Sequence, residues 1–129
     1  MKTKTIMAVD DDEMILKLVG VVVENLGSKL LSASSGERCL EMLKEHTPDM
    51  LILDVQMSGI NGLDLLQKIR TDFPKLTAKV LFLTAHKKPE LMERADQLGC
   101  DGFVLKPIDP YRLRERIKTT FNPSYVESE

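Results

Sequence analysis

The stretch of sequence that decides the fold is MLILD, residues 50–54, a continuous apolar run that ends in one acidic residue. A short run of this kind, rich in β-type residues, indicates a strand covered on both faces, as strands of parallel sheets are. Residues 80–84 form a second such run, which ends in a threonine. Between the two, residues 63–70 carry leucine and isoleucine at helical spacing. Strand, helix and strand in this order predict a parallel pair of strands joined by a crossover helix.

The same alternation continues along the whole chain, with short strand-type runs between helix-type stretches. The expected strands are Thr5–Val9, Lys29–Ser32, Met50–Asp54, Val80–Thr84 and Phe103–Leu105. The expected helices are Glu13–Leu26, a helix opened by a capping box at Ser34–Glu37, Leu63–Arg70, a helix from Pro89 that leads to Gly99, and a last helix striped by Leu113, Ile117 and Phe121. Five strands alternating with five helices predict one α/β domain, a parallel sheet with helices on both faces.

The composition fits a small globular domain. The 129 residues are 43% hydrophobic and 29% charged, and the formal net charge of −2 gives no reason to expect a polyanion as partner. No apolar stretch approaches the roughly 20 residues of a membrane span, and the first apolar run stops at Asp10, too early for a signal peptide. Cys39 and Cys100 are expected to be buried free thiols rather than a disulfide. Together these features predict a cytoplasmic protein.

Polar residues gather where the expected strands end. Residues 10–12 are three aspartates directly after the first strand, Asp54 ends the third, Thr84 ends the fourth and Lys106 follows the fifth. Each alone has a plain explanation, and the three aspartates suit a solvated loop or a helix N-cap as well as a metal site. The carboxyl ends of parallel strands share one edge of the sheet, however, where ligands of such folds bind. The four groups together therefore predict one site.

The chemistry of this group points to phosphate. Clustered carboxylates disfavour joint ionisation unless a cation compensates, and Mg²⁺ binds through carboxylates, waters and phosphate oxygens. Lys106 would add a positive charge suited to a phosphoryl oxygen. A carboxylate can also act as the nucleophile and become an aspartyl-phosphate. These residues predict phosphoryl acceptance by an aspartate.

In these residues the chain closely resembles the receiver domains of two-component signalling. The resemblance covers about residues 5–121, and the order and spacing of its pieces make it specific. The matching pieces are Ala8–Glu13, Leu51–Met57, Gly62, Leu83–Ala85 and Gly99–Pro107.

The resemblance implies a fold, a domain organisation and a function. The fold would be flavodoxin-like, a doubly wound five-stranded parallel (βα)5 sheet with strand order 2-1-3-4-5. Residues 1–121 would form the receiver and 122–129 a frayed tail. Asp54 would take a phosphoryl group from a histidine kinase or a histidine phosphotransfer protein. The protein would then be a signalling phosphoacceptor that assists its own phosphorylation and dephosphorylation, not an enzyme in the usual sense.

The family also implies a role for each matching side chain. Thr84 would turn its hydroxyl onto the phosphoryl group, Lys106 would pair with it, and the peptide before Pro107 is often cis in this family. The implied ligands of the Mg²⁺ cofactor are Asp10, mainly through a water, Asp11, Asp54 and the backbone carbonyl of Gln56. With three aspartates in a row the register could slip and make Asp12 the direct ligand instead of Asp11.

Two positions depart from the usual family pattern. Ser58 stands where a proline is usual, which should loosen the loop without removing a chemical group. Phe103 stands at the switch-aromatic position, where tyrosine is frequent, so it would report activation only by burying or exposing its ring, or else be an ordinary core residue. Gln56 and His86 flank the expected path of the attacking water and would either tune the phosphoryl lifetime or be plain loop residues.

The output would be a population shift on the face built from the fourth helix, fifth strand and fifth helix, toward an output protein or domain or a phosphorylation-dependent homodimer. The cations of residues 112–118 fit a solvated face or such a partner surface better than DNA, and neither nucleic acid nor a membrane is expected as partner.

Two other classes remain open from the residues. A haloacid-dehalogenase-type phosphatase would need an aspartate at Gln56, and a flavodoxin-like FMN binder would need a Ser/Thr/Gly-rich loop at residues 10–12. A receiver that is never phosphorylated is a third.

Overall fold

The computed structural model describes residues 3–125, an alternating chain of five strands and five helices. The strands are β1 (Thr5–Val9), β2 (Lys29–Ala33), β3 (Met50–Asp54), β4 (Lys79–Thr84) and β5 (Gly102–Leu105). The helices are α1 (Glu13–Asn25), α2 (Gly36–Met42), α3 (Gly62–Asp72), α4 (Pro89–Gln97) and α5 (Pro110–Phe121). All ten elements agree with the sequence-based expectation to within a few residues at their ends.

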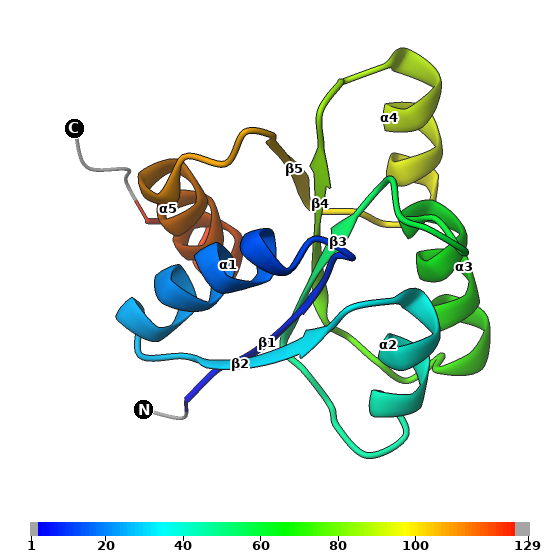
Figure 1. Cartoon of the computed structure of the whole chain (residues 1–129), viewed down its shortest axis with the longest axis horizontal. Helices are drawn as coiled ribbons and strands as arrows, with labels where there is room; N and C mark the ends of the chain where they lie inside the picture. Colours follow the sequence, from blue (N-terminus) through cyan, green and yellow to red (C-terminus); the bar gives the residue numbers. More distant parts are fainter. Residues whose placement is uncertain (1–2, 126–129) are drawn as a thin grey trace.

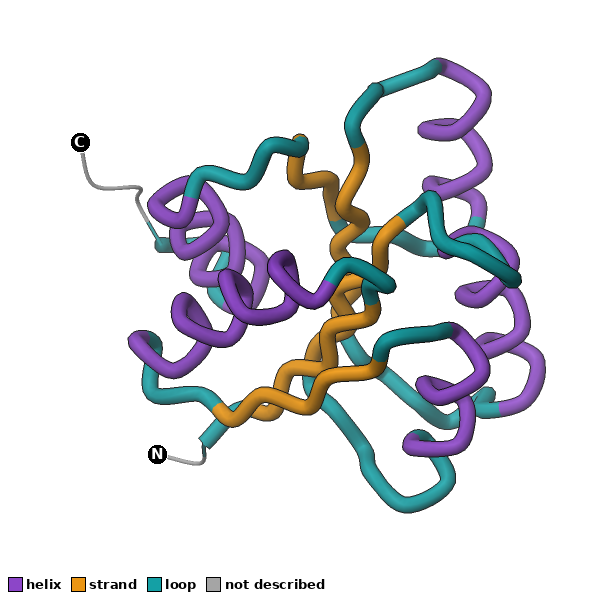
Figure 2. The backbone as a smooth tube through the Cα atoms, viewed as in Figure 1, coloured by secondary structure: helices purple, strands orange, loops and turns teal. Residues whose placement is uncertain are grey.

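All five strands form one parallel sheet in the order β2-β1-β3-β4-β5. The expected doubly wound fold and strand order are therefore confirmed. β3 lies at the centre, between β1 and β4, where Asp54 is paired in register with Leu83 of β4. In Figures 1 and 2, α1 and α5 lie on one side of this sheet and α2, α3 and α4 on the other.

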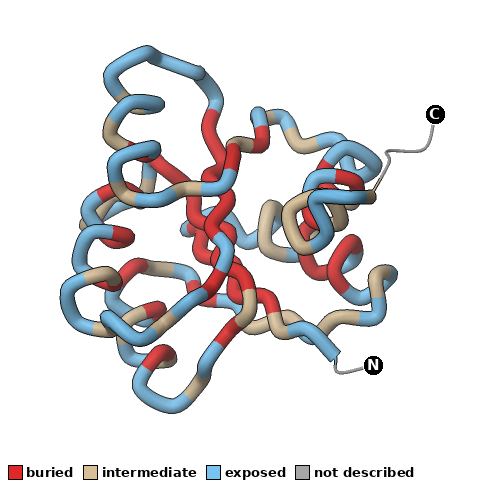
Figure 3. Tube along the Cα trace, turned by 180° about the vertical axis from the view of Figure 1, so that it is seen from behind, coloured by how far each residue is buried: buried red, intermediate tan, exposed pale blue. Residues whose placement is uncertain are grey.

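Alternate residues of the central strands point to two separate hydrophobic cores. In β3, Leu51 and Leu53 pack with α2, α3 and α4, whereas Met50 and Ile52 pack with α1 and α5. Every residue of β3 is buried, which explains its uninterrupted apolar sequence. Figure 3 shows buried residues along the strands and exposed ones on the outer turns of the helices. A strand buried on both faces holds its last residue, Asp54, at the middle of the sheet edge.

The helix starts depend on side-chain caps, and one differs from expectation. Asp12 caps α1, where its side chain accepts a hydrogen bond from the backbone N–H of Met14. For α2 we expected a capping box that starts at Ser34, but the cap is Ser35, which accepts from the N–H of Arg38. The predicted cap is therefore wrong by one residue, because two adjacent serines offer the same hydroxyl.

The last described residues fold back onto α5. The hydroxyl of Tyr125 lies 3.0 Å from Oε1 of Glu115, a buried carboxylate that also accepts from Tyr111. The Lys118 ammonium lies over the Tyr125 ring. The frayed tail expected at 122–129 therefore has packing contacts in its described part, while 126–129 lie outside the described residues.

Two further expectations concern the cysteines and the membrane. Cys39 and Cys100 are both free, as predicted, but only Cys39 is fully buried. None of the helices in residues 3–125 has the length and apolar character needed to span a bilayer.

Candidate functional site

Four strands deliver polar side chains to one edge of the sheet, as the sequence predicts. β1 is followed by Asp10, β3 ends in Asp54, β4 ends in Thr84 and β5 is followed by Lys106. The backbone of Gly62 lies against that of Asp54, so closely that a Cβ atom at position 62 would overlap the carbonyl oxygen of Asp54. The absence of a side chain at this position lets α3 begin directly beside the site.

Three carboxylates meet at this edge. Asp10, Asp11 and Asp54 each offer an oxygen atom, and these atoms lie within 4.8 Å of one another. Asp10 and Asp54 are buried, with 1% and 3% of their surface exposed, whereas Asp11 is exposed. A set of carboxylate oxygens that opens to solvent on one side fits a hard divalent ion such as Mg²⁺, which retains several of its waters. The residues present therefore fit the ion that the family implies.

Lys106 is the cation of this group. Its Nζ lies 3.1 Å from Oδ2 of Asp10 and 3.1 Å from Oδ1 of Asp54. Partial burial alone would lower the pKa of Lys106, but its hydrogen bonds to Asp54 and Asp10 and the negative charges of these two groups together outweigh that effect and raise its pKa. The side chain therefore carries a positive charge over the two buried carboxylates. The peptide bond that follows, Lys106–Pro107, is cis, as the family pattern suggested.

The surroundings of Asp54 disfavour its ionisation. Burial, and to a lesser degree the charge of Asp10, raises its pKa, whereas Lys106 and a hydrogen bond from the backbone of Gln56 lower it, and the net result is a pKa of about 6. An aspartate in this state is ionised at neutral pH yet poorly solvated. Such a carboxylate is suited to be a nucleophile, because little solvent must leave before it reacts.

Asp11 and Asp12 have different partners in the structure. The carboxylate of Asp12 caps α1, whereas Asp11 accepts two hydrogen bonds from the loop after β3. Both come from Ser58, whose backbone N–H lies 2.9 Å and whose hydroxyl lies 3.1 Å from Oδ2 of Asp11. The backbone bond from Ser58 is the main reason that the pKa of Asp11 is lowered. The sequence marked position 58 as a departure from the family but did not foresee this link.

Thr84 and His86 face each other in the loop after β4. The hydroxyl of buried Thr84 donates to the carbonyl oxygen of His86 at 2.8 Å and accepts from its N–H at 3.2 Å. The hydroxyl is thus bound within its own loop rather than to the three carboxylates. Thr84 would have to break these two bonds to reach a group on Asp54.

Comparison with known proteins decides the family. A family model described as "Response regulator receiver domain" matches residues 6–118. The chain belongs to this family. A curated relative, the polar-differentiation response regulator DivK of Brucella ovis, is 32% identical over 117 residues, which cover 91% of this chain and 95% of DivK.

Solved structures of receivers agree with the fold. A response regulator from Thermotoga maritima is 28% identical, with a TM-score of 0.81, and the match covers 92% of this receiver and 98% of that chain. The chemotaxis protein CheY4 of Vibrio cholerae has a TM-score of 0.86 over 92% of this chain and 99% of its own, and its 24% identity supports the fold alone. Family membership favours the receiver over the phosphatase and the FMN binder that the residues left open.

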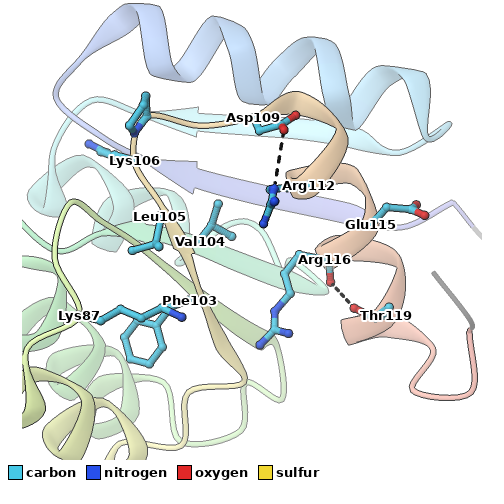
Figure 4. A pocket seen from close by; sticks show the side chains of 11 residues that line it. Lys87, Phe103, Val104, Leu105, Lys106, Asp109, Arg112, Glu115, Arg116 and Thr119 are labelled. Carbon is cyan, nitrogen blue, oxygen red and sulfur yellow. Dashed lines mark hydrogen bonds and ion pairs between the residues drawn. The ribbon is translucent and has the colours of Figure 1, made fainter. Parts of the chain in front are cut away.

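A cleft of about 510 Å³ lies beside the site of this receiver, between β5 and α5. Figure 4 shows Lys106 at one end of it, Phe103 and Lys87 along one side, and Arg112 and Arg116 on the α5 side. The Phe103 ring is half-buried and stacked on Phe82, with 6.1 Å between centroids. The switch-aromatic position is therefore packed inward in this structure.

The neighbouring helix α4 has little fully buried surface and also makes polar contacts with α3. Ala95 is its one buried residue. Arg94 bonds to Asp64 and Gln67 of α3, and Arg70 of α3 donates to the carbonyl oxygens of Leu98 and Gly99 at the end of α4. A helix with so little buried apolar surface can shift at modest cost.

Proposed function

We propose that this receiver accepts a phosphoryl group on Asp54 from the phosphohistidine of a histidine kinase or a histidine phosphotransfer protein. One observation carries the proposal. The carboxylate of Asp54 is buried at the central strand end, within 4.8 Å of two further carboxylate oxygens and in contact with the Lys106 ammonium. Buried negative charge in excess of its cationic partners destabilises the fold, and such groups occur mostly at functional sites.

In the proposed reaction, one carboxylate oxygen of Asp54 attacks phosphorus and a P–O bond forms. The P–N bond to the donor imidazole breaks, and its electron pair remains on that nitrogen. The leaving group is neutral imidazole if the other ring nitrogen already carries a proton, and otherwise it takes a proton from solvent. Asp54 must be ionised to attack, and with a pKa of about 6 it is ionised at neutral pH. The ammonium of Lys106, already beside the carboxylate, would pair with a phosphoryl oxygen during transfer.

The proposed cofactor is Mg²⁺. Asp10, Asp11 and Asp54 would hold it, together with the backbone carbonyl of Gln56, and Asp12 would not because its carboxylate caps α1. When bound, the ion would neutralise negative charge on the carboxylates and on the phosphoryl oxygens. Lys106 would then be free to exchange a carboxylate partner for the phosphoryl group.

The proposed output is a shift in the surface formed by α4, β5 and α5. Thr84 would leave His86 and donate its hydroxyl to the phosphoryl group, which would pull on the loop that leads into α4. The weakly packed α4 would shift with this loop, and the shape of the cleft beside β5 would change. The partner would be a downstream protein or domain or a second copy of the chain, with no direct contact to nucleic acid, in the cytoplasm.

The test is intact-protein mass spectrometry after incubation with acetyl phosphate. We expect one phosphoryl adduct that requires Mg²⁺ and is lost in Asp54→Asn. Asp12→Asn is the matched control, because asparagine also caps helices well and the residue lies outside the carboxylate group. A folded, Mg²⁺-binding protein that forms no adduct would refute the proposal and indicate a receiver that works without phosphorylation.

A further inference from the structure

Ser58 joins two loops that lie far apart in the sequence. Its backbone N–H and its hydroxyl both donate to Oδ2 of Asp11, 47 positions away, at 2.9 and 3.1 Å. A proline, usual at this position in the family, would lack both donors. The link is therefore a property of this chain rather than of the general family pattern.

The two bonds define which part of Asp11 remains available. A carboxylate oxygen has two lone-pair positions, and Ser58 engages both positions of Oδ2. The second oxygen, Oδ1, is left for another partner. Because Asp11 is exposed, its side chain would otherwise sample several rotamers in solvent, at some distance from Asp10 and Asp54.

We propose that Ser58 is a positioning residue of the metal site, which holds the Asp11 carboxylate by one oxygen beside Asp10 and Asp54 and leaves the other oxygen available to the ion. The inference rests on the metal site of the proposed function and adds to it the residue that sets the affinity of that site. Ligating carboxylates are commonly oriented by hydrogen bonds from neighbouring groups, and loss of such a partner typically weakens metal binding about 10- to 100-fold.

The same contact explains why Asp11 rather than Asp12 would bind the ion. Asp12 has its own anchor, the N–H of Met14 at the start of α1, and its backbone N–H donates to Asp10. Asp11 is the aspartate tied across the site to the loop that carries Gln56 and Ser58. Ser58 thus selects between two adjacent carboxylates that the sequence alone does not distinguish.

The experiment is a titration of the metal-free, ¹⁵N-labelled protein with MgCl₂, followed by backbone amide shifts. Ser58→Ala retains the backbone N–H and loses the hydroxyl, so we expect Mg²⁺ affinity to fall several-fold, toward about 10-fold. Ser58→Thr retains both donors and should stay within about two-fold of wild type. In an Asp11→Ala chain, the further change Ser58→Ala should have no additional effect, since its acceptor is gone.

A readout without the ion completes the test. In the metal-free protein, Asp11→Ala should move the Ser58 amide resonance upfield, because its hydrogen bond is lost. If wild type binds Mg²⁺ and Asp54→Asn weakens binding, but Ser58→Ala binds as tightly as wild type or more tightly, the inference about Ser58 is overturned and the metal site stands. If wild type shows no saturable binding, the metal site itself fails and the inference falls with it.

Discussion

Replacement of Asp54 by asparagine should stabilise the metal-free protein at high pH. Burial, with the charge of Asp10 adding to it, raises the pKa of Asp54 from 3.8 to about 6. A shift of this size corresponds to about 3 kcal/mol of unfavourable free energy for holding the ionised form in the native state. Asparagine removes the charge but leaves Lys106 with one carboxylate partner instead of two. We therefore expect Asp54→Asn to gain about 1–3 kcal/mol in unfolding free energy near pH 8.

The gain should depend on pH in a defined direction. A pKa that is higher in the native than in the unfolded state means that the native state binds more protons between these two values. Wild-type stability from this group is therefore fully present below about pH 4 and is lost as pH rises through 6. The advantage of Asp54→Asn should shrink to about half by pH 5.

Mg²⁺ should reduce the stability advantage of Asp54→Asn over wild type. An ion that binds the native carboxylates stabilises wild type by mass action and stabilises Asp54→Asn less, because one ligand is lost. The assay is urea unfolding followed by far-UV circular dichroism near pH 8 and pH 5, with EDTA or with millimolar MgCl₂. Asp12→Asn serves as the control and should show neither the gain in stability near pH 8 nor the weaker stabilisation by Mg²⁺. If Asp54→Asn were less stable than wild type near pH 8 in EDTA, or if its advantage did not vary with pH, the electrostatic reasoning would be refuted.

Three further predictions test other parts of the site and the core. Lys106→Met leaves its two buried carboxylate partners without a cation, so the unfolding free energy near pH 8 in EDTA should fall by about 3 kcal/mol and recover largely with MgCl₂; a loss that MgCl₂ leaves unchanged would contradict this. Gly62→Ala places a Cβ against the backbone of Asp54 and should cost about 2 kcal/mol in urea unfolding, and an unchanged stability would show that the loop can move away freely. A thiol reagent should modify half-buried Cys100 in the native protein. Cys39, whose burial raises its pKa to about 12, should react only on unfolding. The control is Cys100→Ser, and fast labelling of this variant in the native state would contradict the prediction.

The fold was predictable because each strand is short, apolar and followed by a helix with a clear stripe. β3 shows the reason most plainly, since a strand with both faces buried can tolerate no polar residue before its last position. The convergence of Asp10, Asp54, Thr84 and Lys106 follows from the same rule, because parallel strands end at one edge. Placing these four residues at one edge of the sheet required no knowledge of loop conformation.

The finer choices depended on contacts that local sequence does not encode. Thr84 is bound to His86 within its own loop, a rotamer that the strand pattern cannot specify. Ser35 and Ser34 present the same hydroxyl to the start of α2, so only the backbone path separates them. The link from Ser58 to Asp11 joins loops 47 positions apart. Each case is a choice between similar hydrogen-bond partners, which tertiary structure decides.

The charge at the sheet edge gives a physical order to the proposed reaction. Three carboxylates and one ammonium leave two negative charges when all four groups are ionised. A phosphoryl group brings roughly two more at neutral pH, so a donor would meet repulsion unless a divalent cation were bound first. Asp54 responds to the same imbalance, since its raised pKa is the cost of ionising a buried group beside Asp10. The excess negative charge that disfavours the ionised form of Asp54 would therefore also make its phosphorylation depend on a bound divalent cation.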